Sequence, residues 1–126
     1  MFVGVMTGTS VDGLDIAAIE IDLDEQIEFI ASETVAYPPD LRENLLTLSQ
    51  AEAANISSFG ELDATLGGFI GNSVNSFLRK FGINPKEVQA IGSHGQTIRH
   101  QPPNTRGNGE QSFTLQIGDP NRIAYI

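Results

Sequence analysis

The stretch "VGVMTGTSVDGLDIAAIEID", residues 3–22, decides the fold. Apolar residues dominate both of its ends, which is typical of two β-strands, at residues 2–6 and 14–21. Between these strands lies a loop of mostly Gly, Thr, Ser and Asp, residues 7–13, which is too long for a minimal hairpin turn. Glycine permits a backbone to approach a ligand closely, so this loop is a candidate binding element.

The next segments predict one more strand and two helices. Alternating apolar residues at 27–37 predict a strand with one face toward solvent, so we expect the chain to begin with an antiparallel meander. Asp40 precedes leucines at helical spacing and predicts the cap of a first helix, while Ser58 and Glu61 predict a capping box for a second. That second helix has the strongest periodic pattern in the chain, and Gly82 is expected to end it.

Three glycines lie inside the long predicted helix: Gly67, Gly68 and Gly71. Each costs up to about 1 kcal/mol relative to alanine in a helix interior. We expect them to be there because another element approaches the helix closely.

The last part of the chain predicts alternating strands and loops. Residues 88–95 are typical of a short buried strand that ends in a polar loop, 100–111 of a surface loop, and 112–118 of another strand. Asp119 is expected to cap a final helix, with Pro120 as its first residue. The sequence ends inside this element, so we expect a fragment of a longer chain.

Composition limits the function. The 126 residues are 40% apolar and 18% charged, which suits one compact domain, and the absence of cysteine excludes disulfides and thiolate catalysis. No signal peptide or membrane span is predicted, so we expect a cytoplasmic protein. The net charge is −9 and the basic residues are scattered, which argues against nucleic-acid binding. An anionic ligand would need backbone N–H groups or a divalent cation.

The loop at residues 7–13 has the composition of an anion-binding site. Successive backbone N–H groups can hold an anion, Thr9 and Ser10 add hydroxyl donors, and Asp12 could position magnesium directly or through water. The lysine of a Walker A loop is absent. The same residues also suit a hairpin whose Asp and Ser side chains cap local N–H groups, and the residue types alone leave both interpretations open.

Two further polar loops follow predicted strands. Ser93 and His94 are adjacent and should point to opposite faces of an extended chain, which makes them a poor nucleophile–base pair. Gln96 and Thr97 carry neutral donors and acceptors that suit sugar hydroxyls. Asp119 begins the third loop, where a simple helix cap is the competing interpretation.

Three segments together, "GVMTGTSVDGLDIA", "IGSHGQTIRHQP" and "FTLQIGDPNRIA", resemble the N-terminal part of the anhydro-N-acetylmuramic acid kinases in order and spacing. The resemblance covers essentially this whole chain and about the first third of a typical member. It implies an α/β, ribonuclease H-like (actin-like ATPase) mixed sheet, with an antiparallel meander of three strands followed by helices. Residues 1–126 would then form the N-terminal part of an incomplete first domain, and the second domain would be absent from this chain.

The resemblance also implies an activity. Members hydrolyse the 1,6-anhydro bridge of anhydro-N-acetylmuramic acid and phosphorylate the sugar with ATP and Mg²⁺, giving N-acetylmuramic acid 6-phosphate in cell-wall recycling. The partners implied are the sugar and ATP, with a homodimer for the full-length protein. The catalytic aspartate of the family is expected beyond residue 126, so no general base is assigned here and the fragment alone is expected to be inactive.

The resemblance assigns site residues by position. The phosphates of ATP are expected at one set of residues, with Asp12 also orienting the metal through water: Gly8, Thr9, Ser10, Val11, Asp12, Gly13, Leu14 and Asp15. The sugar is expected at a second set: His94, Gln96, Thr97 and Asp119.

Three alternatives remain. The protein could be a kinase of the same superfamily that acts on another sugar, or a non-catalytic module of the ATPase fold that binds nucleotide. A hydrolase built on Ser10, His94 and Asp119 is the third, although nothing in their spacing requires it.

Overall fold

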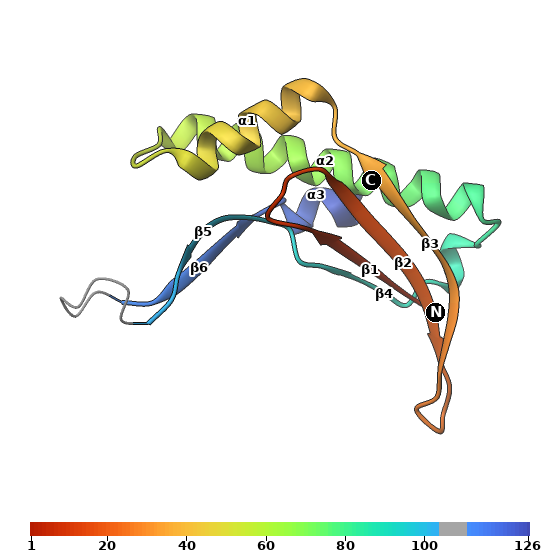
Figure 1. Cartoon of the computed structure of the whole chain (residues 1–126). Coiled ribbons are helices and arrows are strands. Elements are labelled where there is room, and N and C mark those ends of the chain that lie inside the picture. The colour runs from red at the N-terminus through yellow and green to blue at the C-terminus, as the bar shows by residue number, and fades with distance from the viewer. Residues whose placement is uncertain (104–110) are drawn as a thin grey trace.

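The computed structural model describes residues 1–103 and 111–126, and its centre is a four-stranded mixed sheet (Figure 1). The first three strands form an antiparallel meander and the fourth joins β1 in parallel, which confirms the predicted start of a mixed α/β fold. The strands follow one another across the sheet as β3 (Ile27–Ala36), β2 (Gly13–Ile21), β1 (Phe2–Thr7) and β4 (Ala90–Ser93).

The two faces of the sheet differ in burial. The register places Val3 opposite Ala18 and Val5 opposite Ile16, and all four side chains are buried on the face that the helices cover. Met6 points to the other face and is 58% exposed. We call this second side the open face of the sheet.

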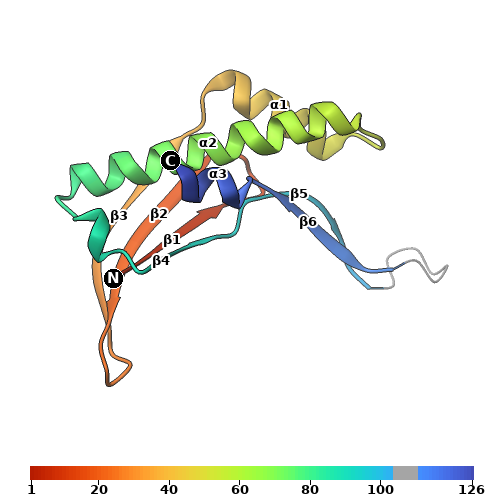
Figure 2. The ribbon, with the colours of Figure 1, turned by 180° about the vertical axis from the view of Figure 1, so that it is seen from behind.

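Three helices pack on the covered face, as the view from behind also shows (Figure 2). They are α1 (Pro39–Gln50), α2 (Ile56–Lys80) and α3 (Pro120–Tyr125), and a 3-10 turn at Pro85–Glu87 precedes β4. The long helix α2 buries an apolar stripe, as its periodicity predicts: Leu66, Ile70, Val74, Phe77 and Leu78. No helix in the described ranges has the length and apolar content needed to cross a bilayer.

Two predicted helix starts were wrong. Asp40 lies in the first turn of α1, whose N-cap is Pro38, because proline already has the backbone angle that a helix start needs. Helix α2 begins before Ser58, since the Asn55 side chain accepts hydrogen bonds from the N–H groups of Ser57 and Ser58 at 2.8 and 3.3 Å. The predicted end is confirmed, because Gly82 has φ +65 just after the helix.

Two of the three glycines in α2 allow the segment around α3 to pack closely against the helix. A Cβ on Gly67 would lie 2.7 Å from the carbonyl oxygen of Asp119, and one on Gly71 would lie 3.2 Å from Cβ of Ile126. A Cβ on Gly68 would meet only a side-chain atom at 3.9 Å, so Gly68 has no such packing reason.

A two-stranded hairpin extends away from the sheet (Figure 1). Strand β5 (Gln96–Gln101) pairs with β6 (Phe113–Ile117), which confirms the strand predicted at 112–118. The predicted loop at 100–111 was wrong at its first two residues, because they belong to β5; its part at 104–110 lies outside the described residues.

Strand β4 was predicted to be buried and is exposed along its whole length. The reason is its position, because β4 is the edge of the sheet and pairs only with β1 in the described part of the chain.

Candidate functional site

Three loops meet where β1 and β4 end. The Thr7 hydroxyl donates to the Gly95 carbonyl at 2.9 Å, and the Gln96 amide nitrogen donates to the Gly8 carbonyl at 3.2 Å. A Cβ on Gly118 would lie 3.6 Å from Cα of Gly95, so the turn before α3 reaches the same place. The carboxyl ends of parallel strands are where open α/β sheets bind ligands, and the three segments that the sequence singled out separately converge there.

The loop after β1, residues 8–12, is tightly folded. The Val11 N–H donates to the Gly8 carbonyl at 3.3 Å, and Val11 has φ 52, a left-handed conformation that is unfavourable for a β-branched residue. Its side chain is buried in the core, and Arg42 of α1 donates from Nε to the Val11 carbonyl at 2.8 Å. The strained conformation is therefore held by packing on one side and by a hydrogen bond on the other.

The same loop offers backbone donors to solvent. Thr9, Ser10 and Asp12 are exposed, and their backbone N–H groups have no hydrogen-bond partner among the described residues. Free N–H groups gathered in one turn can hold an anion without a cationic side chain.

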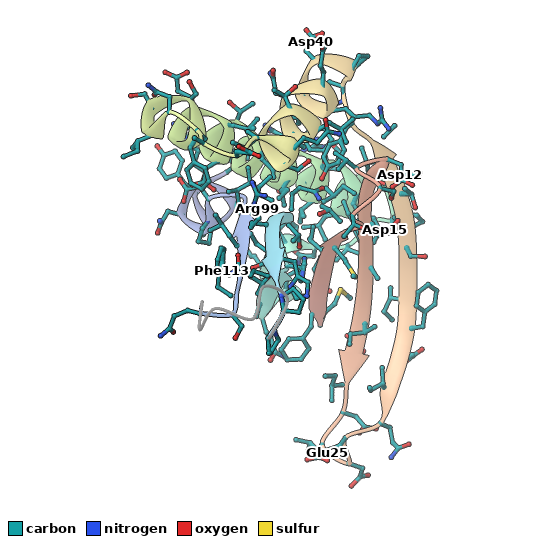
Figure 3. The ribbon with its side chains drawn as sticks, turned by 60° about the vertical axis from the view of Figure 1, so that its left-hand side comes forward. Asp12, Asp15, Glu25, Asp40, Arg99 and Phe113 are labelled. Atoms are coloured by element: carbon teal, nitrogen blue, oxygen red, sulfur yellow. The ribbon has the colours of Figure 1, made fainter. Side chains whose placement is uncertain are left out.

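The acidic residues of this region have different surroundings. Asp12 is exposed at the loop, and its carboxylate has no hydrogen bond or ion pair within residues 1–103 and 111–126 (Figure 3). Asp15 lies on the open face, where it accepts a hydrogen bond from the Thr34 hydroxyl. Leu14 is fully buried in the core, so its side chain faces away from any ligand in the loop.

Tyr37, directly after β3, is a buried neighbour of the loop that the sequence did not single out as functional. Burial raises the pKa of its hydroxyl to about 12; the Thr7 hydroxyl opposes this pKa shift, and the negative charge of Asp12 adds to it. The hydroxyl contacts Oε1 of Gln96 at 3.5 Å. In the sequence, Tyr37 was only the last residue of an alternating strand.

His94 and Ser93 lie on opposite faces, as predicted. His94 lines a hollow of about 530 Å³ on the open face, together with Met6 and Asp15, whereas Ser93 lines one of about 560 Å³ among α2, α3 and β4. The imidazole Nδ1 of His94 lies 2.9 Å from the Gly95 carbonyl oxygen. The adjacent pair therefore cannot act as nucleophile and base on one substrate.

Gln96 and Thr97 begin β5 but differ in access. The Gln96 side chain is 1% exposed, so a direct contact with a sugar would require it to leave its buried position. Thr97 is half-buried, and its hydroxyl accepts a hydrogen bond from Gln116 at 3.4 Å.

Asp119 caps α3, which is the competing interpretation given above. Its carboxylate accepts a hydrogen bond from the Asn121 N–H at 2.9 Å. Asp63 of α2, which the sequence did not single out, fixes the turn before the helix: its carboxylate accepts from the Gly118 N–H at 2.6 Å and its carbonyl from the Asp119 N–H at 3.2 Å. A carboxylate in the middle of a long helix gives no sign of such a role in the sequence.

No hydrogen bond within the described chain links Ser10, His94 and Asp119, so the geometry gives the hydrolase alternative no support. The described residues also contain no group of three or more metal-ligating side chains. A magnesium ion at Asp12 would therefore have at most two protein carboxylates, with phosphate and water oxygens as its other ligands, which is the usual arrangement for this metal. The free carboxylate of Asp12 fits that role.

Comparison with known proteins gives consistent matches over the whole chain. The family model described as "Anhydro-N-acetylmuramic acid kinase" matches residues 1–126. Curated proteins with that name are similar to this chain: one from Vibrio vulnificus is 44% identical over 124 residues, one from Coxiella burnetii 44% over 125, and one from Xylella fastidiosa 42% over 129. These alignments cover 98%, 99% and 100% of this chain but 32% of each relative, so the chain spans about a third of their length.

Proposed function

Because this chain belongs to the anhydro-N-acetylmuramic acid kinase family, we propose that it is the N-terminal part of the first actin-like ATPase domain of a sugar kinase. In this proposal the second domain, which is absent from the chain, contributes most of the adenosine pocket. The full-length protein is cytoplasmic and forms a homodimer.

The proposed reaction is the conversion of anhydro-N-acetylmuramic acid, ATP and water to N-acetylmuramic acid 6-phosphate and ADP. Water adds across the 1,6-anhydro bridge, and the oxygen freed at carbon six receives the terminal phosphoryl group of ATP. The product belongs to the recycling of cell-wall sugar. The observation that carries this proposal is the family match over residues 1–126 together with the convergence of the three loops.

The loop at residues 8–13 holds the terminal phosphates of ATP through its backbone N–H groups, aided by the hydroxyls of Thr9 and Ser10. Phosphoryl transfer depends mainly on positioning and on stabilisation of charge, and both suit a preformed set of amides. Magnesium, when bound, neutralises phosphate charge that the net charge of −9 would otherwise repel. Asp12 orients that ion through water.

The sugar lies toward the two other loops. His94, Thr97 and Asp119 are the proposed contacts, and their loops adjoin the phosphate loop through Gly95 and Gly118. No residue of this chain is assigned as the general base.

The activity is tested with the full-length kinase that contains this chain, by following ADP formation with ATP, magnesium and a panel of sugars. We expect turnover that requires the anhydro sugar. Turnover with a different sugar would instead support the related-kinase alternative, and ATP binding without sugar-stimulated turnover would support the non-catalytic module.

The role of Asp12 gives a first prediction. In the full-length kinase, Asp12→Ala should lower turnover by at least about tenfold, because an oriented metal stabilises charge that develops during transfer. Asp24→Ala is the matched control, since Asp24 is exposed in the β2–β3 turn, next to Glu25 and far from the loop (Figure 3). Equal turnover in the two variants would remove Asp12 from the site.

A further inference from the structure

Two buried polar side chains sit between the phosphate loop and the loop that precedes β5. Thr7, Ser73 and Gln96 are the buried polar residues of the described chain, and Thr7 and Gln96 both lie at this junction. Their hydrogen bonds are reciprocal, because Thr7 donates to the carbonyl of Gly95 and Gln96 donates to the carbonyl of Gly8. Buried polar groups are costly unless satisfied, so this pairing specifies one relative position of the two loops.

Both N–H donors of the Gln96 side chain are engaged without any ligand. Its amide nitrogen donates to the Gly8 carbonyl at 3.2 Å and to the Thr97 carbonyl at 3.4 Å, and its oxygen faces the Tyr37 hydroxyl at 3.5 Å. An amide nitrogen has two N–H donors, and both are used. The side chain is therefore built into the protein and is not held ready for a sugar hydroxyl.

The direction of the Gly8 carbonyl determines the direction of the next amide. The peptide bonds here are trans, and in a trans peptide the C=O and the following N–H point in opposite directions. Because Gln96 and the Val11 N–H both hold the Gly8 oxygen, the Thr9 N–H must point the other way. Thr9 is an exposed residue, and its N–H has no hydrogen-bond partner among the described residues.

Arg42 does the same at the other end of the loop. Its Nε donates to the Val11 carbonyl at 2.8 Å, which turns the Asp12 N–H in the opposite direction. Asp12 is also exposed. Gln96 thus fixes the Gly8 carbonyl and orients the Thr9 N–H. In the same way Arg42 fixes the Val11 carbonyl and orients the Asp12 N–H.

We propose that Gln96 and Arg42 are positioning residues that aim the Thr9 and Asp12 amides at the terminal phosphates of ATP. This rests on the proposed function, in which residues 8–13 bind those phosphates. It replaces the sequence-based expectation that Gln96 contacts the sugar. Neither residue touches the substrate, and each acts through one backbone carbonyl of the loop.

The test uses steady-state kinetics of the full-length kinase with Gln96→Met, Arg42→Met and Arg42→Lys. Loss of the neutral hydrogen bond in Gln96→Met should raise the apparent KM for ATP by about tenfold. Arg42→Met should raise it by at least as much, because the lost donor is a charged guanidinium. The KM for the anhydro sugar should change much less. Arg42→Lys should recover part of the ATP affinity, because its ammonium can still donate to the Val11 carbonyl.

Gln101→Met is the matched control. Gln101 lies at the far end of the same strand, donates to the Gln111 carbonyl at 3.0 Å, and should keep wild-type kinetics. If Gln96→Met does not fold, as judged by its thermal unfolding, the exposed Arg42 decides the question through its two variants.

The outcomes separate this inference from the proposed function. If the wild type turns over and both methionine variants have the same apparent KM for ATP as Gln101→Met, the positioning role alone is overturned. A sugar KM that rises more than the ATP KM in Gln96→Met would return Gln96 to the sugar side and overturn it as well. A wild-type protein that binds no ATP would overturn the proposed function and this inference together.

Discussion

At the scale of single residues, Tyr37 shows how the core and the candidate site share groups. Its side chain is 6% exposed and packs against Phe69 of α2, with ring centroids 5.4 Å apart. Its hydroxyl lies beside Gln96, and the negative charge of Asp12 contributes to its raised pKa. A core side chain thus carries an ionisable group that also faces the candidate site.

The Tyr37 hydroxyl predicts a pH dependence of stability. Its pKa is raised from 10.0 to about 12 in the folded protein. The unfolded chain therefore loses this proton first, and the stability that the protonated hydroxyl gives is complete below pH 10 and lost as the pH rises toward 12. We expect the free energy of unfolding of Tyr37→Phe to fall less steeply than that of the wild type across this window, as measured by urea unfolding.

Tyr125→Phe provides the control, because Tyr125 is 92% exposed and its replacement should leave the wild-type slope. Parallel curves for the wild type and Tyr37→Phe would show that the folded protein does not hold this proton.

At the scale of elements, two neighbouring glycines of α2 allow the effect of helix propensity on stability to be measured apart from the effect of packing. Gly67→Ala should lower the free energy of unfolding by about 1–3 kcal/mol, because the new Cβ would overlap the Asp119 backbone. Gly68→Ala should raise it by about 0.5–1 kcal/mol, because alanine is the better helix former and has space there.

Chemical denaturation of the two single variants beside the wild type measures both effects. Opposite signs are the expected result. Equal destabilisation would mean that α2 tolerates no side chain along this stripe, and equal stabilisation would mean that α3 is not held close to it.

The elements also show how far the sequence can lead. The meander and α2 follow from apolar periodicity, which reports directly on burial. Strand β5 has a mostly polar sequence and is held by pairing with β6, so periodicity could not reveal it. The helix starts were misplaced because Pro38 and Asn55 serve as caps two and three residues, respectively, before the side chains that the sequence favoured.

The candidate site, too, could be predicted from the sequence only in part. Loop composition predicted residues 7–13 and 92–97 as candidate binding segments, because glycines and small polar residues are informative without a structure. Composition does not give direction, so it could not show that Gln96 points inward or that Arg42 reaches the Val11 carbonyl. Asp63 was missed for the same reason.

At the scale of the whole molecule, helices cover one face of the sheet and the other is open over the described residues. Met6 and Phe29 are 58% and 63% exposed. The three loops meet at the ends of β1 and β4.

Because the chain spans about a third of its relatives' length, we predict that the 126-residue polypeptide alone lacks kinase activity. We expect no ADP formation that depends on the anhydro sugar, whereas the full-length kinase assayed under the same conditions should form ADP. Addition of the isolated polypeptide at increasing concentration is the most sensitive version of the assay. Sugar-dependent ADP that grows with the amount of polypeptide would place a complete catalytic set within these residues.

The bracing of the loop has a consequence for protein engineering. Arg42 lies 31 positions from the carbonyl that it holds, and Gln96 lies 88 positions from its own. A synthetic peptide with the sequence of residues 7–13, or a graft of that segment onto a foreign hairpin, would lack both supports and relax out of the strained Val11 geometry. A transplant of this loop must therefore carry the sheet, α1 and the beginning of the β5–β6 hairpin with it, together with α2, whose apolar stripe belongs to the same core as Val11.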